Sequence, residues 1–336
     1  EGVTMLLTLV ALVQQPLAAP ADLTKRAHTY SIVAYDSATG DLGVAVQSKF
    51  PNVGGIVPWA RAGVGAVATQ SLGNTAYGDD GLRLMAMGAT APEAMRIVMR
   101  SDQRPAQRQV GMVDARGNAA SWTGDSCFDW AGGRTLGEDG RIVLGGKGAM
   151  IVGRHFAAQA NIMVSDQTVK NMADAFVRAT GSLADRLMAA LVAGQAGGGD
   201  KRGMESAALL VVRANGGYLG ANDRYIDIRV YDDTNPIREL QRLYRLHQLY
   251  FFQSRPEDLV TITPDIVKQL EPILLAEPVN QKEKWLDAPQ GTATPKFLQA
   301  LENFMYWENY DVRVRTDGKI DRVALEDILA RRRKRP

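Results

Sequence analysis

The chain is poor in the side chains that most often serve as bases and nucleophiles in enzymes. Its 336 residues include three histidines and one cysteine. His28 precedes the first predicted strand and His247 falls in a predicted C-terminal helix, so the sequence offers little for a Ser-His-Asp relay. Cys127 has no second cysteine to pair with, and we expect it to be a small buried hydrophobe rather than a nucleophile. Catalysis by histidine or cysteine therefore has weak support.

Signals for metals and nucleotide cofactors are also missing. No run of His, Cys, Asp and Glu has the spacing of a zinc site. The Gly-Gly-Lys-Gly segment at 145–148 lacks the spacing of a phosphate-binding P-loop and is interpreted as a turn. We therefore expect neither a metal nor a cofactor.

Charge and hydropathy do not indicate a nucleic-acid-binding or membrane protein. The net charge is +2, with 46% apolar and 23% charged residues, as in ordinary globular proteins. The basic tail at 331–335 carries five positive charges and is expected to be a solvated terminus, so no nucleic-acid partner is expected. No segment reaches the length of a transmembrane helix, and we do not expect an integral membrane protein.

The N-terminal segment has the pattern of a secretory signal. An apolar run at 6–13 is too short to span a bilayer and leads into the small residues of 17–21. Cleavage after Ala19 or Ala21 would release a secreted or periplasmic protein. A buried hydrophobic strand is the alternative for this run. Residues 1–28 are therefore assigned to a signal peptide and a short pro-segment.

Three short strands are predicted between Thr29 and Gln70, and a threonine heads the first. A threonine at a chain terminus supplies its own base, because an α-amino group titrates near pH 7.7 to 8.0 and can take the hydroxyl proton directly or through a water. Thr29 becomes such a residue only if the His28–Thr29 bond is cut, by the protein itself or by a protease acting near Lys25 and Arg26. The alternative is that Thr29 is a β-branched residue at an ordinary strand start.

Beyond Gln70 the pattern alternates between strand-rich blocks and pairs of helices. The predicted helices cover 75–87, 90–100, 165–180 and 182–194, and the predicted strands cover 109–114, 119–123, 206–214 and 225–231. Thr90, Ser165 and Ser182 are the expected N-caps of their helices. Two strand blocks, each followed by a helix pair, favour an α+β fold with four layers, αββα.

Several runs resemble a known family in the same order along the chain. They lie at 29–34, 43–46, 57–63, 65–70, 122–124, 127, 130–132, 159–161 and 194–203, so the resemblance spans about 29–232. The family is the bacterial and archaeal domain of unknown function 1028, which is placed in the N-terminal-nucleophile hydrolase superfamily. The resemblance implies a four-layer αββα sandwich of that hydrolase type, with the glycine-rich segment at 194–203 near the mouth of the active site.

Two features depart from the family pattern. Gly133 stands where the family tends to have a histidine, which puts any acid or base role at that position in doubt. Residues 136–155 are extra, and we interpret them as an inserted hairpin or flap. His155 lies at the edge of this insertion and is not expected to be a ligand.

The chain changes character at the turn-rich segment 232–236, which separates 29–233 from a mainly helical region at 234–336. The predicted helices here are 236–252, 263–275, 294–307 and 321–332, with a short strand at 310–314. This region resembles a peptidoglycan-binding domain found attached to the same family. Its aromatic residues could stack on the sugars of a cell-wall glycan, although most of them must form the core of so small a domain. They are Trp285, Phe297, Phe304, Tyr306, Trp307 and Tyr310.

These features together predict a secreted amidohydrolase in which Thr29 attacks an amide carbonyl. The supporting residues are assigned by strand position: hydroxyl relays, a cation that lowers a pKa, and oxyanion donors. They are, in that order, Ser31 and Ser48; Lys49 or Arg61; and Thr69, Gln70 or Asn161. The substrate would be a small amide or a peptide, and a homo-oligomer is expected. The alternative is a non-catalytic binding or assembly protein of the cell envelope, which keeps the fold without freeing Thr29.

Overall fold

The computed structural model describes residues 29–127, 134–136, 142–144, 149–276 and 284–332. The predicted signal peptide and pro-segment at 1–28 lie outside these residues, as do 137–141 and 145–148 of the predicted insertion. The chain divides into two compact units, 1–236 and 237–336, which are described separately below.

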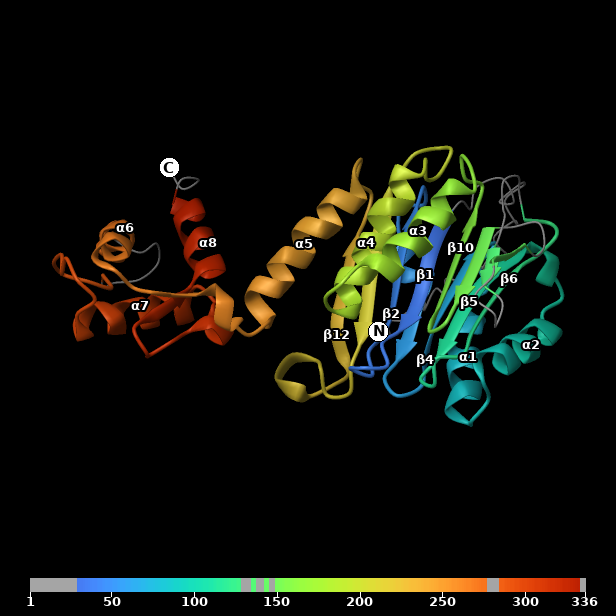
Figure 1. Cartoon of the computed structure of the whole chain (residues 1–336), viewed down its shortest axis with the longest axis horizontal. Coiled ribbons are helices and arrows are strands. Elements are labelled where there is room, and N and C mark those ends of the chain that lie inside the picture. The colour runs from blue at the N-terminus through green and yellow to red at the C-terminus, as the bar shows by residue number, and fades with distance from the viewer. Residues whose placement is uncertain (1–28, 128–133, 137–141, 145–148, 277–283, 333–336) are drawn as a thin grey trace, which may run out of the picture. The chain divides into compact units, whose positions relative to one another are not determined.

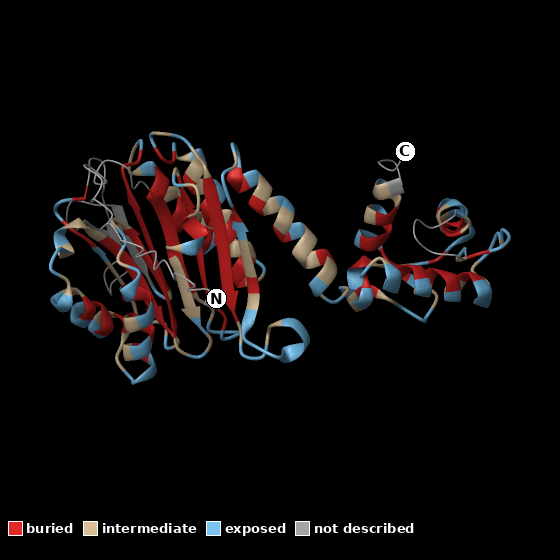
Figure 2. Cartoon of the chain, turned by 180° about the vertical axis from the view of Figure 1, so that it is seen from behind, coloured by how far each residue is buried: buried red, intermediate tan, exposed pale blue. Residues whose placement is uncertain are grey.

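The first unit contains a six-stranded antiparallel sheet in the order β12-β11-β2-β1-β10-β9. β1 and β2 lie at its centre and are buried along almost their whole length, because both faces of the sheet are covered (Figure 2). The predicted strands at 206–214 and 225–231 are confirmed to within two residues at either end. The strands are β1 (Thr29–Tyr35), β2 (Leu42–Ser48), β9 (Ala149–Gly153), β10 (Phe156–Asn161), β11 (Ser206–Val212) and β12 (Arg224–Val230).

A four-stranded antiparallel sheet, in the order β3-β4-β5-β6, packs face to face against the first sheet (Figure 1). Its strands are β3 (Pro58–Arg61), β4 (Gly65–Ser71), β5 (Arg108–Asp114) and β6 (Ala119–Thr123). The short β3 was not predicted, since it begins at a proline and is half-exposed. Small and β-branched side chains from both sheets form an apolar layer between them, which includes Val33, Val44, Val46, Ala66, Ala68 and Val113.

Helices cover the outer faces of both sheets. α1 (Ala76–Ala86) and α2 (Ala91–Ser101) pack on the four-stranded sheet, and α3 (Gln167–Arg178) and α4 (Leu183–Ala196) pack on the six-stranded sheet. All four predicted helices are confirmed.

Two of the three predicted N-caps of these helices are confirmed. Thr90 and Ser182 each form a capping box with the acidic residue three positions later. Ser165 lies one residue before the N-cap position, which Asp166 occupies without a side-chain cap hydrogen bond. The Ser165 hydroxyl nevertheless accepts from the backbone nitrogen of Gln167 (3.3 Å), the first residue of α3.

The predicted insertion separates into two parts. β7 (Arg134–Leu136) and β8 (Ile142–Leu144) form an antiparallel hairpin of their own. β9 instead pairs with β10 and is an edge strand of the six-stranded sheet. Residues 149–153 therefore belong to the main sheet and not to a separate flap.

The second unit is mainly helical, with one small antiparallel sheet. Its core includes the fully buried rings of Phe297 and Tyr310. The elements are α5 (Pro236–Phe251), β13 (Leu259–Thr261), α6 (Pro264–Leu274), α7 (Pro295–Trp307), β14 (Lys319–Asp321) and α8 (Arg322–Arg332).

The strand predicted at 310–314 is wrong. Residues 311–313 form a short 3-10 turn, and the strand of this region is β14. The Tyr310 hydroxyl donates to Asp327 (2.6 Å), and the buried Arg313 guanidinium donates to Asp321 (2.6 Å) and to the carbonyl of Leu249 (2.7 Å). These contacts outside the segment outweigh the β propensity of its Tyr and Val residues.

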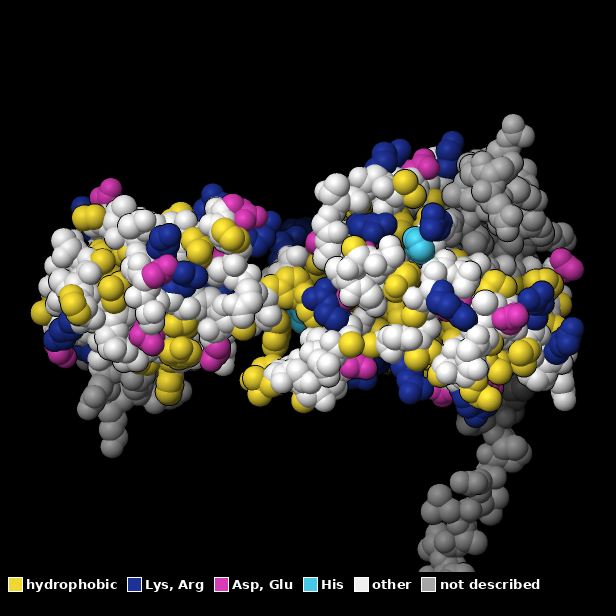
Figure 3. Space-filling view, turned by 60° about the horizontal axis from the view of Figure 1, so that its bottom comes forward, with side chains coloured by type: hydrophobic (Ala, Val, Ile, Leu, Met, Phe, Trp, Pro, Cys, Tyr) yellow, Lys and Arg dark blue, Asp and Glu magenta, His cyan; other side chains and the backbone are white. Residues whose placement is uncertain are grey.

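No helix in the described part of the chain is long and apolar enough to cross a membrane. On the face shown in Figure 3, Lys and Arg side chains are interspersed with acidic and apolar ones.

Candidate functional site

Three neighbouring strands of the six-stranded sheet, β1, β2 and β10, have polar residues at the same end of the sheet. Thr29 at the start of β1 pairs with Ser48 at the end of β2 and with Asn161 at the end of β10. Val33 and Val46 face the second sheet, and alternate residues of a strand share a face. Thr29, Ser48 and Asn161 therefore also point between the two sheets.

The hydroxyl of Thr29 is buried in this interior. Thr29 is 4% exposed, and its Oγ1 lies 3.1 Å from Oγ of Ser48, where either atom can donate. The carbonyl of Thr29 accepts a hydrogen bond from Nε2 of Gln70 (3.2 Å), which comes from β4 of the facing sheet. The start of β1 is thus held from both sheets.

Amide side chains fill this end of the interior. Gln70 also donates from Nε2 to Oε1 of Gln109 on β5 (2.6 Å) and accepts at Oε1 from the Ser31 hydroxyl (2.6 Å). Ser31 in turn accepts from Nε2 of Gln159 on β10 (2.7 Å). Asn161 donates from Nδ2 to Oε1 of Gln109 (2.9 Å). The space between the sheets is apolar at the other end, so this polar network is a local and specific feature.

Five of the eight predicted site residues lie in this network. They are Thr29, Ser31, Ser48, Gln70 and Asn161. The structure does not bring the other three to Thr29, and each lies apart for a different reason.

Thr69 precedes Gln70 on β4, so its side chain points to the opposite face, where Oγ1 donates to the carbonyl of Asn74 (3.1 Å). The side chain of Thr69 therefore does not face the network.

The two candidate cations also lie elsewhere. Nζ of Lys49 forms an ion pair with Glu205 at 3.2 Å. Arg61 is exposed and pairs with Gly65, which is five residues, or about 17 Å, along β4 from Gln70. Neither cation is therefore aimed at Thr29.

Residues in the left-handed region follow two of the network side chains. Ile162, directly after Asn161, has φ 58°, and Ser71, directly after Gln70, has φ 67°. A β-branched residue such as isoleucine rarely adopts this conformation, because Cβ meets the backbone. Strain of this kind is concentrated at functional sites, so these turns mark the same end of the sandwich.

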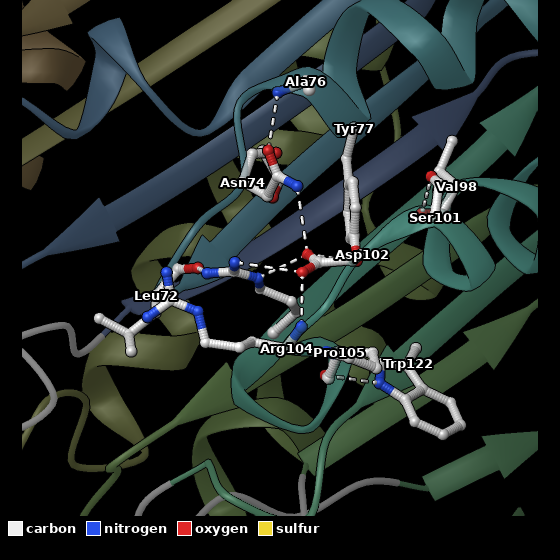
Figure 4. Close-up of polar contacts among 12 residues, drawn as sticks. Leu72, Asn74, Ala76, Tyr77, Val98, Ser101, Asp102, Arg104, Pro105 and Trp122 are labelled. Atoms are coloured by element: carbon white, nitrogen blue, oxygen red, sulfur yellow. Dashed lines mark hydrogen bonds and ion pairs between the residues drawn. The ribbon is translucent and has the colours of Figure 1, made fainter.

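A charged cluster supports the network from the side of the four-stranded sheet (Figure 4). Asp102, after α2, accepts hydrogen bonds from Nε of Arg108 (2.8 Å), the hydroxyl of Tyr77 (2.9 Å), Nδ2 of Asn74 (3.1 Å) and the backbone nitrogen of Arg104 (2.8 Å). Burial opposes ionisation of this carboxyl, but the hydrogen bonds, led by that of Arg108, hold the pKa of Asp102 well below its ordinary value. Asp102 is therefore an ionised carboxylate, and its side chain is 5% exposed.

Arg108 connects this cluster to the site. Its guanidinium also donates to the carbonyl of Leu72, and the next residue along β5 is Gln109 of the network. The cluster thus holds the start of β5, where Gln109 lies, and Leu72, which directly follows β4 and lies two residues after Gln70.

Cys127 is buried beside the same segment, with Sγ 3.4 Å from the carbonyl of Arg108. Burial raises the pKa of this thiol, so it is protonated at neutral pH. The prediction that Cys127 is a small buried hydrophobe is confirmed.

The glycine-rich segment lies against the end of β2. Asp200, within it, accepts from the backbone nitrogen of Lys49 (3.3 Å) and forms an ion pair with Arg202 (3.1 Å). The charge of Arg202 is thus engaged by a carboxylate next to it. Among the described residues, no group of three or more His, Cys, Asp or Glu side chains could hold a metal ion.

Gln109, Gln159 and Thr123 belong to the network but were not predicted as site residues. Nε2 of Gln109 donates to Oγ1 of Thr123 (2.8 Å) and to the carbonyl of Ala160 (2.9 Å). For Gln109 and Thr123 a signal was present in the sequence, because they are polar residues of the predicted strands 109–114 and 119–123 and the two-residue period places them on one face. Gln159 lies on β10, which was not predicted as a strand.

Comparison with solved structures identifies a relative with a similar fold. A crystal structure of protein SPO2555 from Silicibacter pomeroyi, with the family model DUF1028, is 27% identical, with a TM-score of 0.55, over 66% of this chain and 89% of that one. Anbu, the ancestral beta-subunit from Yersinia bercovieri, aligns over 75% of this chain and 100% of its own at 11% identity, but its TM-score of 0.28 is too low to indicate a shared fold. No curated protein is significantly similar in sequence.

The model of one protein family matches residues 29–240, from the first residue of β1 to the start of α5. This range covers well over half of the sequence and includes every residue of the network. The chain therefore belongs to the family of unknown function DUF1028.

Proposed function

We propose that the protein is a secreted amide hydrolase whose nucleophile is the hydroxyl of Thr29, freed by cleavage of the His28–Thr29 bond. The two facing sheets with their outer helices would be the αββα sandwich of an N-terminal-nucleophile hydrolase. The substrate would be a small amide or a peptide, and the α-amine of Thr29 would be the base.

The observation that carries this proposal is the setting of the Thr29 hydroxyl. Thr29 is the first residue of a central strand, and its side chain is buried. The Thr29 hydroxyl lies 3.1 Å from the hydroxyl of Ser48, at the polar end of an otherwise apolar interior. Burying so many amide and hydroxyl groups brings little stability, because each exchanges a hydrogen bond to water for one inside the protein. The presence of this network at the head of β1 therefore supports a functional role for Thr29.

The chemistry requires no group beyond the chain and water. The Thr29 Oγ1 attacks the substrate carbonyl while the α-amine takes its proton, directly or through the Ser48 hydroxyl. The resulting ammonium protonates the leaving nitrogen, which departs as an amine and leaves an ester on Thr29. Water then attacks the ester with the same amine as base, releasing the acid and regenerating the hydroxyl.

The test is the N-terminus of the mature protein. Intact-mass measurement of protein purified from its own host should give a chain that begins at Thr29, because the mechanism needs a free α-amine. A mature chain that begins at Pro20 or Asp22 and is nevertheless fully active would contradict the proposal.

The alternative is a non-catalytic envelope protein. It is favoured by the positions of the two cations, because neither lies beside Thr29: Lys49 is paired with Glu205, and Arg61 is on β3 opposite Gly65, the first residue of β4. A mature chain that begins at Pro20 or Asp22 and hydrolyses no amide would support this alternative.

We further propose that residues 234–336 bind cell-wall glycan or peptide through exposed aromatic rings. Of the six aromatic residues predicted to bind, Phe297, Phe304 and Tyr310 are buried in the core. Tyr306 and Trp307 are 49% and 54% exposed, and Trp307 lies 6.1 Å, centroid to centroid, from Trp285. An exposed ring of this kind can stack on a sugar.

Trp307→Ala in the full chain is expected to reduce retention on insoluble cell-wall material about tenfold, measured by co-sedimentation, because one stacking contact is lost. Tyr218→Ala removes an aromatic ring that is 70% exposed in the first unit and should leave retention unchanged. Equal retention of both variants and the unaltered protein would refute binding through this surface.

A further inference from the structure

One hydrogen-bond acceptor in the network is left over, and it lies beside Thr29. Asn161 is fully buried, and its Oδ1 has no hydrogen-bond partner among the residues that the structure describes. A buried carbonyl oxygen without a partner costs free energy, so it is expected only where another group occupies the position in the working protein.

The identity of this atom follows from donor and acceptor logic. The carbonyl of Ala160 can only accept, so the atom of Gln109 that lies 2.9 Å from it must be the nitrogen. The other amide atom of Gln109 is then its oxygen, which can only accept, so the atom of Asn161 at 2.9 Å from it must be Nδ2. The oxygen of Asn161 is therefore the atom without a partner.

The backbone nitrogen of Thr29 points toward Asn161. The N–H of Tyr35 donates to the carbonyl of His155 on the β10 side (2.8 Å), and the register from there to Thr29 is continuous. In an antiparallel ladder, hydrogen-bonded pairs recur every two residues. Thr29 and Asn161 therefore form such a pair, with the Thr29 nitrogen directed at β10 and both side chains on one face.

Cleavage before Thr29 changes the number of donors at this nitrogen. The peptide nitrogen has one N–H, which the ladder engages, whereas a neutral amine has two and an ammonium has three. Cleavage thus creates at least one extra donor in a buried position, next to an acceptor that has no partner.

Given the proposed function, we propose that Oδ1 of Asn161 accepts a hydrogen bond from the α-amine of mature Thr29 and orients that amine toward its own hydroxyl. Asn161 is then a positioning residue and not the oxyanion donor that strand position suggested, because its only amide nitrogen is engaged by Gln109. With one N–H held by the ladder and one by Asn161, the amine lone pair is directed to the remaining side, where the Thr29 hydroxyl and Ser48 lie.

The test measures the pKa of the α-amine itself, without a substrate. Its acetylation by acetic anhydride is followed against pH by mass spectrometry in processed protein whose terminus is verified as Thr29. An acceptor stabilises the ammonium more than the neutral amine, so Asn161→Leu should lower the pKa by about one unit. Asn161→Asp keeps an acceptor and adds a negative charge, so it should raise the pKa.

The opposite signs separate a specific contact from general loosening of the network. Thr123→Val removes another buried partner of Gln109, one that is not beside Thr29, and should leave the pKa of the amine unchanged. If Asn161→Leu does not fold, the rise in Asn161→Asp against the unaltered protein remains the test.

Three outcomes would overturn the inference. With Thr29 at the terminus, an unchanged pKa in both Asn161 variants, or an equal shift in Thr123→Val, would remove the role of Asn161 and leave the proposed nucleophile intact. If no mature chain begins at Thr29, both the role of Asn161 and the proposed nucleophile Thr29 are contradicted.

Discussion

Thr29→Ala is expected to abolish covalent reaction at the site, whereas Thr29→Ser retains part of it. The hydroxyl is the only group proposed to attack, so its removal should lower amide hydrolysis by about 10⁴-fold or more. A β-lactone probe makes the measurement independent of the natural substrate, because it acylates an activated hydroxyl and adds a defined mass to the intact chain. Each variant should be prepared with residue 29 at its terminus.

The serine variant keeps the hydroxyl and the α-amine, and loses only the methyl group that restrains χ1. Ser31→Ala is a matched control, since it removes a buried hydroxyl two residues along the same strand that accepts from Gln159 and donates to Gln70. The Ser31 hydroxyl contacts Gln70 and Gln159, whereas the hydroxyl beside Thr29 is that of Ser48, so the structure does not support the predicted relay role of Ser31. Ser31→Ala should therefore weaken the fold without preventing acylation. Undiminished labelling of Thr29→Ala would place the chemistry at another residue.

Asp102→Ala is expected to destabilise the first unit by about 3 to 5 kcal/mol, because it leaves the largely buried Arg108 without its carboxylate. It also leaves Tyr77 and Asn74 without their acceptor. Urea unfolding of the full chain would measure this loss. Asp80→Ala is the control, since its pair with Arg83 is exposed and its removal should cost below about 1 kcal/mol.

The contribution of Asp102 should depend on pH in a defined direction. Its pKa is lower in the folded protein than in the unfolded chain, where a carboxyl titrates near pH 3.9. The stabilisation is therefore complete above about pH 4 and is lost as the pH falls toward the folded pKa. The stability difference between the unaltered protein and Asp102→Asn should shrink below pH 4, and a difference that grew with acid would contradict an ionised, hydrogen-bonded carboxylate.

Local signals in the sequence were sufficient to predict most of the helices. The Thr90 and Ser182 caps, and the Thr-Pro starts of α6 and α7, act through backbone groups within three residues, so sequence alone contains them. The segment at 310–314 has equally clear β propensity but forms a turn. Its conformation depends on Arg313 reaching α5 and Asp321, which a local pattern does not contain.

The two-residue period of strands is enough to decide which of two neighbouring candidate residues faces Thr29. Thr69 and Gln70 are neighbours on β4, so only one of them can face Thr29, and the same rule separates Ser48 from Lys49. The partners of Gln70 could not be predicted from the sequence. Gln109 and Gln159 lie on other strands, and the position of those strands relative to β4 depends on how the two sheets pack. The Asp102 cluster joins α1, α2 and β5 and has no sequence spacing by which to recognise it.

The amide network also constrains how the site can diverge among related proteins. The side-chain amide of Gln109 accepts hydrogen bonds from two donors and donates to two acceptors. Replacing Gln109 alone would therefore leave several neighbouring groups without a hydrogen-bond partner. Replacements within the network should therefore be strongly non-additive, and tolerated mainly as matched sets. New substrate preferences should therefore arise more easily through residues that line the approach to Thr29 without joining the network, and we expect the amide network to change more slowly than those residues.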